Sequence, residues 1–289
     1  MWSLRIFGGL GWKELGLRII KEVGKDDVFG RAAQLAFYFL LALFPLLLFL
    51  TVLLGYAAES GTELRNRLLN YLSAVLPVSA SDLIYTTVDD ISKASSGGKL
   101  SFGVLAALWA SSNGMSALIQ SLNVAYNVEE ARPWWKRRMV SIGLTIALAV
   151  LIISALTLLL IGEAIGETIA ESFGLGYAFT TTWKIVQWPL VLAFALLSFN
   201  LAYYFAPNVK NQTWKWVTPG AIVGLSLWLL VSFALRGYLK FFNTYNVTYG
   251  SLGAVIILML WFYFTGAAIL IGGEVDSEID AASKTQEHN

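Results

Sequence analysis

The stretch MVSIGLTIALAVLIISALTLLLIG, residues 139–162, carries no charged side chain and decides the fold. The hydrocarbon core of a bilayer is about 30 Å thick, and roughly 20 apolar residues of α-helix cross it. Six stretches share this property: Ala32–Ala58, Leu100–Val128, Met139–Gly162, Ile185–Val209, Val217–Leu235 and Phe241–Gly273. Because lipid offers the backbone no hydrogen bonds, such segments must be helical. The sequence therefore predicts an all-α, polytopic membrane protein with six transmembrane helices.

The composition excludes several classes of function. The chain is 57% hydrophobic and 13% charged, whereas soluble domains carry about 25% charged residues. A net charge of +1 argues against a nucleic-acid partner. There is no cysteine, and the single histidine, His288, lies in the terminal segment. We therefore expect no metal, no cofactor and no catalytic residues, and the chain is not predicted to be an enzyme.

The distribution of positive charge predicts the topology. Most of the 20 Lys and Arg residues fall in the N-terminal segment and in the gaps on the same side of the membrane. Positive loops stay inside, so both termini are expected in the cytoplasm of a multi-pass inner (plasma) membrane protein. The predicted organisation has three parts. They are a cytoplasmic amphipathic segment (1–31) lying on the membrane interface, a six-helix domain (32–273) with an outer helical loop (59–99), and a cytoplasmic polar tail (274–289).

The second span carries a stripe of polar side chains at alternating steps of four and three residues, so they share one helix face. Such a stripe makes hydrogen bonds between helices or lines a polar path for a solute, and the sequence leaves both interpretations open. Prolines in the first and fourth spans interrupt helices, as in many transporters. The candidate path residues are Gln34, Tyr38, Pro45, Trp109, Asn113, Gln120, Asn123, Asn200, Tyr204, Tyr249 and Gly250.

A basic and aromatic cluster follows the second span. Tryptophans at headgroup depth next to cytoplasmic arginines are typical of an interface anchor. The residues predicted to contact lipid headgroups are Arg132, Trp134, Trp135, Lys136, Arg137 and Arg138.

Several motifs together resemble the YihY/BrkB family of bacterial inner-membrane proteins, formerly labelled ribonuclease BN and grouped with UPF0761 proteins. They are RAAQLAFY with Phe44-Pro45, LWASSNG from Leu108, NVAYN from Asn123 with Arg132-Pro133-Trp134-Trp135, TPGA from Thr218 and YGSLGA from Tyr249. The resemblance covers about residues 10–275 and implies six helices with both ends in the cytoplasm. The ribonuclease label conflicts with the sequence, because the acidic residues fall in separate loops and RNA cleavage with metal ions needs clustered ligands.

Two functions fit these features. The first is a transporter that moves a lipid or another amphipathic solute along a polar path in the helix bundle. The alternative is a membrane scaffold that docks a periplasmic or cytoplasmic partner, with residues 59–99 as the periplasmic docking segment. Membrane lipids are expected partners in both, and a homo-oligomer is compatible with either.

Overall fold

The computed structural model describes residues 11–57, 97–210, 212–241 and 251–287, and these residues form helices joined by turns and loops, with no strand among them. The helices are α2 (Trp12–Lys25), α3 (Val28–Ala57), α6 (Gly97–Ala125), α7 (Trp134–Phe173), α8 (Tyr177–Phe205), α9 (Pro219–Phe241) and α11 (Ser251–Glu287). The all-α prediction is confirmed. Tyr249, Gly250 and most of the predicted outer loop 59–99 lie outside the described residues.

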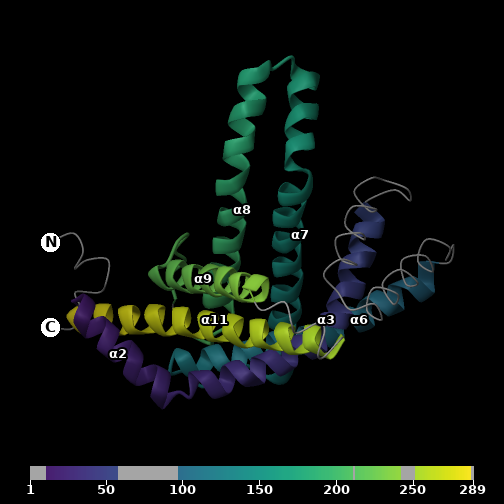
Figure 1. Cartoon of the computed structure of the whole chain (residues 1–289). Coiled ribbons are helices and arrows are strands. Elements are labelled where there is room, and N and C mark those ends of the chain that lie inside the picture. Colours follow the sequence, from purple (N-terminus) through teal and green to yellow (C-terminus); the bar gives the residue numbers. More distant parts are fainter. Residues whose placement is uncertain (1–10, 58–96, 211, 242–250, 288–289) are drawn as a thin grey trace.

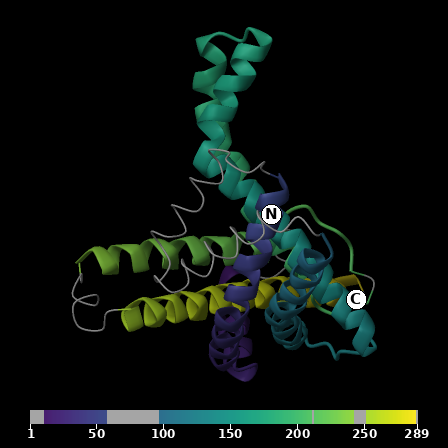
Figure 2. The ribbon, with the colours of Figure 1, turned by 90° about the vertical axis from the view of Figure 1, so that its right-hand side faces the viewer.

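In the described part of the chain, the long helices pack as three pairs: α3 with α6, α7 with α8, and α9 with α11. The α7–α8 pair projects away from α9 and α11, which run side by side across its base (Figure 1). A view turned by 90° shows the same divergence (Figure 2). Helix α11 also contacts α3, α6 and α2, so it connects the pairs. The pairs therefore meet at a common base and do not form a parallel bundle.

The prediction of six spans is confirmed only in part. Helices cover most of the described residues of all six predicted stretches. Four segments within these helices are long and apolar enough to cross a membrane: Trp134–Leu159, Tyr177–Phe205, Pro219–Tyr238 and Val255–Thr285. Among the described residues, the apolar segment of α3 is Val28–Leu43, which is too short to count as a candidate span. Helix α6 contributes no candidate span among those residues. Six transmembrane helices are not confirmed.

The two ends of the described chain pack against each other. On α2, the predicted amphipathic helix, Leu15 and Ile19 pack against Val275, Ile279 and Ala282 of α11. The apolar face of α2 thus covers protein, whereas we expected it to face the membrane surface; Trp12, Leu17 and Ile20 stay exposed. The predicted polar tail from residue 274 also differs, because α11 continues as a helix to Glu287. Burying the apolar side chains of both segments stabilises this arrangement.

Local sequence explains two of the helix ends. Helix α7 ends at Gly174, which has a φ of 65° in the left-handed region that glycine adopts without steric cost. Helix α6 ends before Asn127, whose φ is 50°, and asparagine tolerates this conformation better than most residues. The turn at Gly174 reverses the chain into α8. The turn at Asn127 leads the chain into the loop that precedes α7.

Candidate functional site

A polar groove with a volume of about 360 Å³ lies between α3 and α6. It is lined by Tyr38, Leu41 and Ala42 of α3 and by Ala110, Asn113, Ser116, Ala117 and Gln120 of α6. The two helices approach closely at Gly114, where a Cβ atom would lie 3.2 Å from the Cβ of Ala42. The side chains of Tyr38, Asn113 and Gln120 are exposed in the groove. Part of the predicted stripe therefore faces outward between two apolar helices.

Helix α7 supports one edge of this groove through Arg138. The Arg138 Nη1 atom donates to Asn113 Oδ1 at 2.8 Å, and Nη2 donates to the carbonyl of Trp109 at 2.5 Å. The guanidinium carbon lies 3.7 Å from the centroid of the Trp109 ring, in a cation–π contact. The Ser116 and Ser141 hydroxyls pair at 2.9 Å one turn further along. These contacts fix the orientation of Asn113 at the edge of the groove.

A second group of polar residues, the base network, joins the α6–α7 loop to the α8–α9 loop. It comprises Asn123, Glu130, Arg132 and Asn208. The Asn123 side chain is 4% exposed, donates to Glu130 Oε2 at 2.9 Å and accepts from the Asn208 backbone N–H at 2.7 Å. Arg132 binds both Glu130 oxygens at 2.7 Å and donates to the carbonyl of Ala206. Asn123 therefore lies in this network and does not line the groove.

Burial raises the pKa of Glu130, but hydrogen bonds from Arg132 and Asn123 outweigh it, so the pKa lies below the ordinary value. The Glu130 carboxylate is accordingly ionised at neutral pH. Arg132 compensates the negative charge of Glu130 within the base network, as the burial of an ion pair requires.

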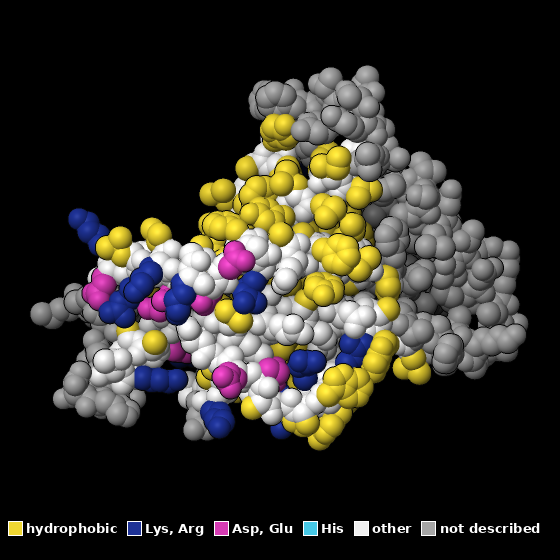
Figure 3. All heavy atoms as spheres, turned by 90° about the horizontal axis from the view of Figure 1, so that it is seen from below, with side chains coloured by type: hydrophobic (Ala, Val, Ile, Leu, Met, Phe, Trp, Pro, Cys, Tyr) yellow, Lys and Arg dark blue, Asp and Glu magenta, His cyan; other side chains and the backbone are white. Residues whose placement is uncertain are grey.

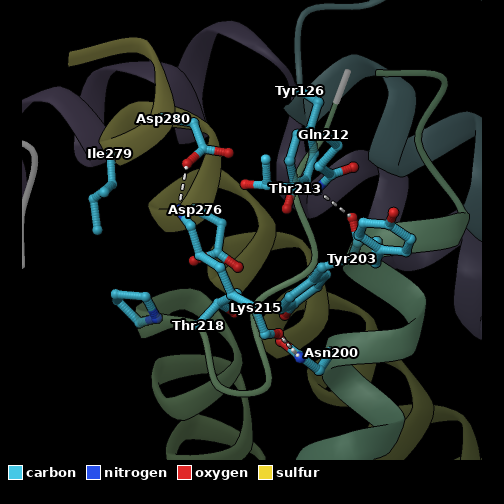
Figure 4. Close-up of a pocket in the computed structure, with 12 residues that line it drawn as sticks. Tyr126, Asn200, Tyr203, Gln212, Thr213, Lys215, Thr218, Asp276, Ile279 and Asp280 are labelled. Atoms are coloured by element: carbon cyan, nitrogen blue, oxygen red, sulfur yellow. Dashed lines mark hydrogen bonds and ion pairs between the residues drawn. The ribbon is translucent and has the colours of Figure 1, made fainter. Parts of the chain in front are cut away.

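A third polar feature is a small cavity beside the α8–α9 loop and α11, with a volume of about 20 Å³ (Figure 4). Asp276 Oδ1 accepts a hydrogen bond from the Gly220 N–H at 2.7 Å, and the Tyr203 hydroxyl donates to the carbonyl of Ile269 at 2.7 Å. Asn200 donates to the carbonyl of Lys215. The volume suits about one water molecule, so this cavity is too small for a solute.

The predicted path residues thus divide among several places. Tyr38, Asn113 and Gln120 line the groove, and Trp109 flanks it under Arg138. Gln34 is exposed on α3, one turn before Tyr38, and Pro45 is partly buried within α3. Asn200 and Tyr204 line the small cavity. The structure does not bring these residues together along a single path.

The predicted headgroup residues divide in a similar way. Trp134, Trp135 and Lys136 are exposed, and Arg137 is partly exposed. Arg132 and Arg138 instead bind protein groups in the base network and at the groove. Charged side chains gather towards the end of the molecule where α2 lies, as the view from below shows (Figure 3). A headgroup role stays a prediction for the exposed members.

Sequence reasoning missed the structural roles of Arg138 and Glu130. Arg138 was predicted to contact lipid headgroups and Glu130 was assigned no role, because side-chain contacts between distant helices leave no local pattern. The steps from Trp109 to Asn113 and on to Ser116 predicted only that these residues share one helix face, because helical periodicity is local.

Comparisons with known proteins agree with the predicted family. The model of the family described as Virulence factor BrkB matches residues 19–289. The ribonuclease-like protein YfkH of Bacillus subtilis is 38% identical over 280 residues, covering 96% of this chain and 98% of that protein. A UPF0761 membrane protein of Alteromonas mediterranea is 26% identical over 281 residues, covering 93% of this chain and 89% of that protein. No solved structure matches this chain. With its apolar helices and a family match over nearly its whole length, the chain belongs to the BrkB family of membrane proteins.

Proposed function

We propose that this membrane protein translocates a lipid or another amphipathic solute, whose polar head travels along the groove between α3 and α6. The observation that carries the proposal is the exposure of Tyr38, Asn113 and Gln120 on the surface of two apolar helices. Amide and hydroxyl groups that face acyl chains without partners cost free energy. A polar headgroup in the groove would satisfy them.

The hydrogen-bonding capacity of the groove favours a headgroup with acceptor oxygens. Arg138 occupies the side-chain oxygen of Asn113, so the remaining hydrogen-bonding group of that side chain is its amide donor. Gln120 and Tyr38 can add donors from the other end of the groove and from α3. Phosphate and carboxylate oxygens accept from such groups.

An apolar cavity adjoins the same helix pair and could take the hydrocarbon part of the solute. It has a volume of about 290 Å³ and lies among α3, α6, α7 and α11. Phe39, Met115, Leu148, Trp261 and Phe262 are among its lining residues. Ala42 contributes to both the groove and the cavity, so the polar and apolar surfaces flank one helix contact.

We place the protein in the inner membrane with both termini in the cytoplasm. The contact between α2 and the last turns of α11 supports this topology, because it requires both ends of the described chain to lie on one side. The positive charges of α2 favour the cytoplasmic side.

The test is the transfer of a fluorescent phospholipid between the leaflets of proteoliposomes. The variant combines Gln120→Leu with Tyr38→Phe, which removes two groove donors and leaves the Arg138–Asn113 contact in place. Loss of about 1.4 kcal/mol of headgroup binding in the rate-limiting state would slow transfer about tenfold. The control is Ser154→Leu on α7, outside the groove, and it should transfer lipid at the wild-type rate.

An unchanged rate in the groove variant would remove the groove from the mechanism. The scaffold alternative would then gain support if deletion of residues 62–95 released a co-purifying partner. Those residues lie outside the described part of the chain, so the structure offers no observation in favour of that alternative.

A further inference from the structure

A buried acidic side chain in α11, Glu274, has no place in the groove or in the base network. Its residue is only 1% exposed, and neither carboxylate oxygen has a hydrogen-bond partner. Two glycines precede it and allow close packing. A Cβ on Gly272 would lie 2.6 Å from the carbonyl oxygen of Gly220, and one on Gly273 would lie 2.9 Å from Leu122. Helices α9 and α6 therefore enclose this turn of α11.

The nearest acidic partner comes from the junction between α2 and α3. Asp26 caps the C-terminus of α2, is 9% exposed, and interacts electrostatically with Glu274. Its Oδ2 atom, like both carboxylate oxygens of Glu274, has no hydrogen-bond partner. Two buried carboxyl groups thus face each other across the contact between α11 and this junction.

The charged groups around the pair do not supply the missing donor. Glu22 on α2 and Glu278 on α11 are acidic and add repulsion. The one lysine that faces the pair within the described residues, Lys25, directs its Nζ to Glu22 at 2.5 Å and to Asn127 at 3.4 Å. Arg31 on α3 also faces Asp26, and its Nε donates to the backbone carbonyl of Asp26 at 2.9 Å. Tyr126, directly after α6, lines the small cavity with Asp276 instead, and its hydroxyl has no hydrogen-bond partner.

Ionising both carboxylates of a buried pair costs free energy, because each disfavours the charge of the other and burial removes water from them. A proton on one of them removes a charge and creates the absent donor. We propose that Asp26 and Glu274 form a proton-binding site, a carboxylic acid–carboxylate pair that joins α11 to the α2–α3 junction. Burial also raises the pKa of Asp26.

Release of this proton would leave two carboxylates in contact and push α11 away from the α2–α3 junction. Helices α3 and α11 both line the apolar cavity, through Phe39 and Ala42 on one side and Trp261 and Phe262 on the other. The proton site and the cavity therefore share the contact between α3 and α11. The site itself can be tested without any transport assay.

The direct test is infrared spectroscopy of the full chain in lipid at neutral pH. A protonated carboxyl gives a carbonyl band that shifts in heavy water. We expect Glu274→Gln and Asp26→Asn each to lose this band, whereas Glu14→Gln, which alters an exposed carboxylate on α2, should keep it. Absence of the band in the wild type would overturn the proposal, and this result requires no variant to fold.

The second test is thermal unfolding between about pH 5 and pH 8, above the ordinary carboxyl pKa of about 4. The folded chain holds a proton that the unfolded chain has released, so the free energy of unfolding must fall as the pH rises. Glu274→Gln should flatten this slope, and Glu14→Gln should leave it unchanged. A slope equal to that of the wild type, or a stabilisation by sodium ions that replaces the pH dependence, would contradict a proton site.

Discussion

At the scale of single residues, the base network shows how a charge is held at the end of a membrane domain. Arg132 and Glu130 are mostly buried, with side chains 11% and 16% exposed, and their contact is bidentate. Arg132 also reaches the carbonyls of Phe205 and Ala206 at the end of α8. One ion pair thus fixes the α6–α7 loop against a helix that is distant in sequence. Removing one partner should cost more than it does at a surface ion pair, because the other charge would stay buried without compensation.

We predict that Glu130→Gln lowers the free energy of unfolding by about 2 kcal/mol at neutral pH, since it weakens charge-assisted hydrogen bonds. The pKa of Glu130 is lowered in the folded state, so its stabilisation is present above the ordinary value of 4.5 and is lost as the pH falls below it. The stability difference between variant and wild type should therefore shrink on acidification. Unfolding in detergent micelles measures it, with Glu129→Gln, an exposed neighbour, as the control.

Sequence reasoning predicted residue roles where they depended on helix periodicity and failed where they depended on loops. The spacing placed Asn113 and Gln120 on one helix face, and the structure shows that both line the groove. Asn123 was also predicted as a path residue, but it lies in the last turn of α6, next to the α6–α7 loop. Its side chain contacts Glu130 and Asn208 of two loops, which no pattern in the sequence could indicate.

At the scale of helices, the contact between α9 and α11 depends on two facing glycines. A Cβ on Gly272 would meet the carbonyl oxygen of Gly220, and a Cβ on Gly220 would meet the Asp276 side chain. Asp276 accepts from the Gly220 N–H in the first turn of α9, where the helix itself offers no acceptor. The close approach of the helices and this hydrogen bond therefore depend on each other.

We predict that Gly220→Ala lowers the free energy of unfolding by about 1–3 kcal/mol, the usual cost of overpacking. The matched control is Gly237→Ala on the same helix, where an added Cβ meets nothing within 4 Å. That variant should be neutral or slightly stabilising, because alanine favours helix more than glycine does. Equal stability of the two variants in a thermal unfolding assay would show that the glycine contact is not needed.

The continuation of α11 as a helix beyond residue 273 could have been predicted from the sequence. Val275, Ile279 and Ala282 recur at steps of four and three, which is typical of an amphipathic helix. The acidic residues between them suggested a solvated tail. The three apolar residues pack against Leu15 and Ile19 of α2. The sequence alone does not indicate that the two segments pack together.

At the scale of the whole molecule, the tip of the α7–α8 pair and the packed terminal segments lie far apart (Figure 1). The all-α class of the described residues was correctly predicted, since charge-free length is a strong signal. Hydropathy predicts the lengths of apolar segments but not the directions in which helices pack. It therefore could not predict the number of spans or the divergence of the helix pairs.

We predict that the two ends of the described chain and the α7–α8 tip lie on opposite sides of the membrane. The chain lacks cysteine, so a single introduced cysteine is the one thiol that a maleimide can label. Lys13→Cys on α2 should react with an impermeant maleimide only in inverted vesicles. Tyr177→Cys, at a position 86% exposed at the tip, should react only in intact spheroplasts. Labelling of both positions from one side would contradict this topology, and solubilised protein, in which both should react, is the control.

The three helix pairs of the described chain converge at the base and diverge beyond it. In a bilayer, lipid would fill the space between the far ends of the three pairs, and their spacing would then depend on bilayer thickness and lateral pressure. A thinner or more tightly compressed membrane would act on the angle between the pairs. The surrounding bilayer would then act as a mechanical effector of this protein.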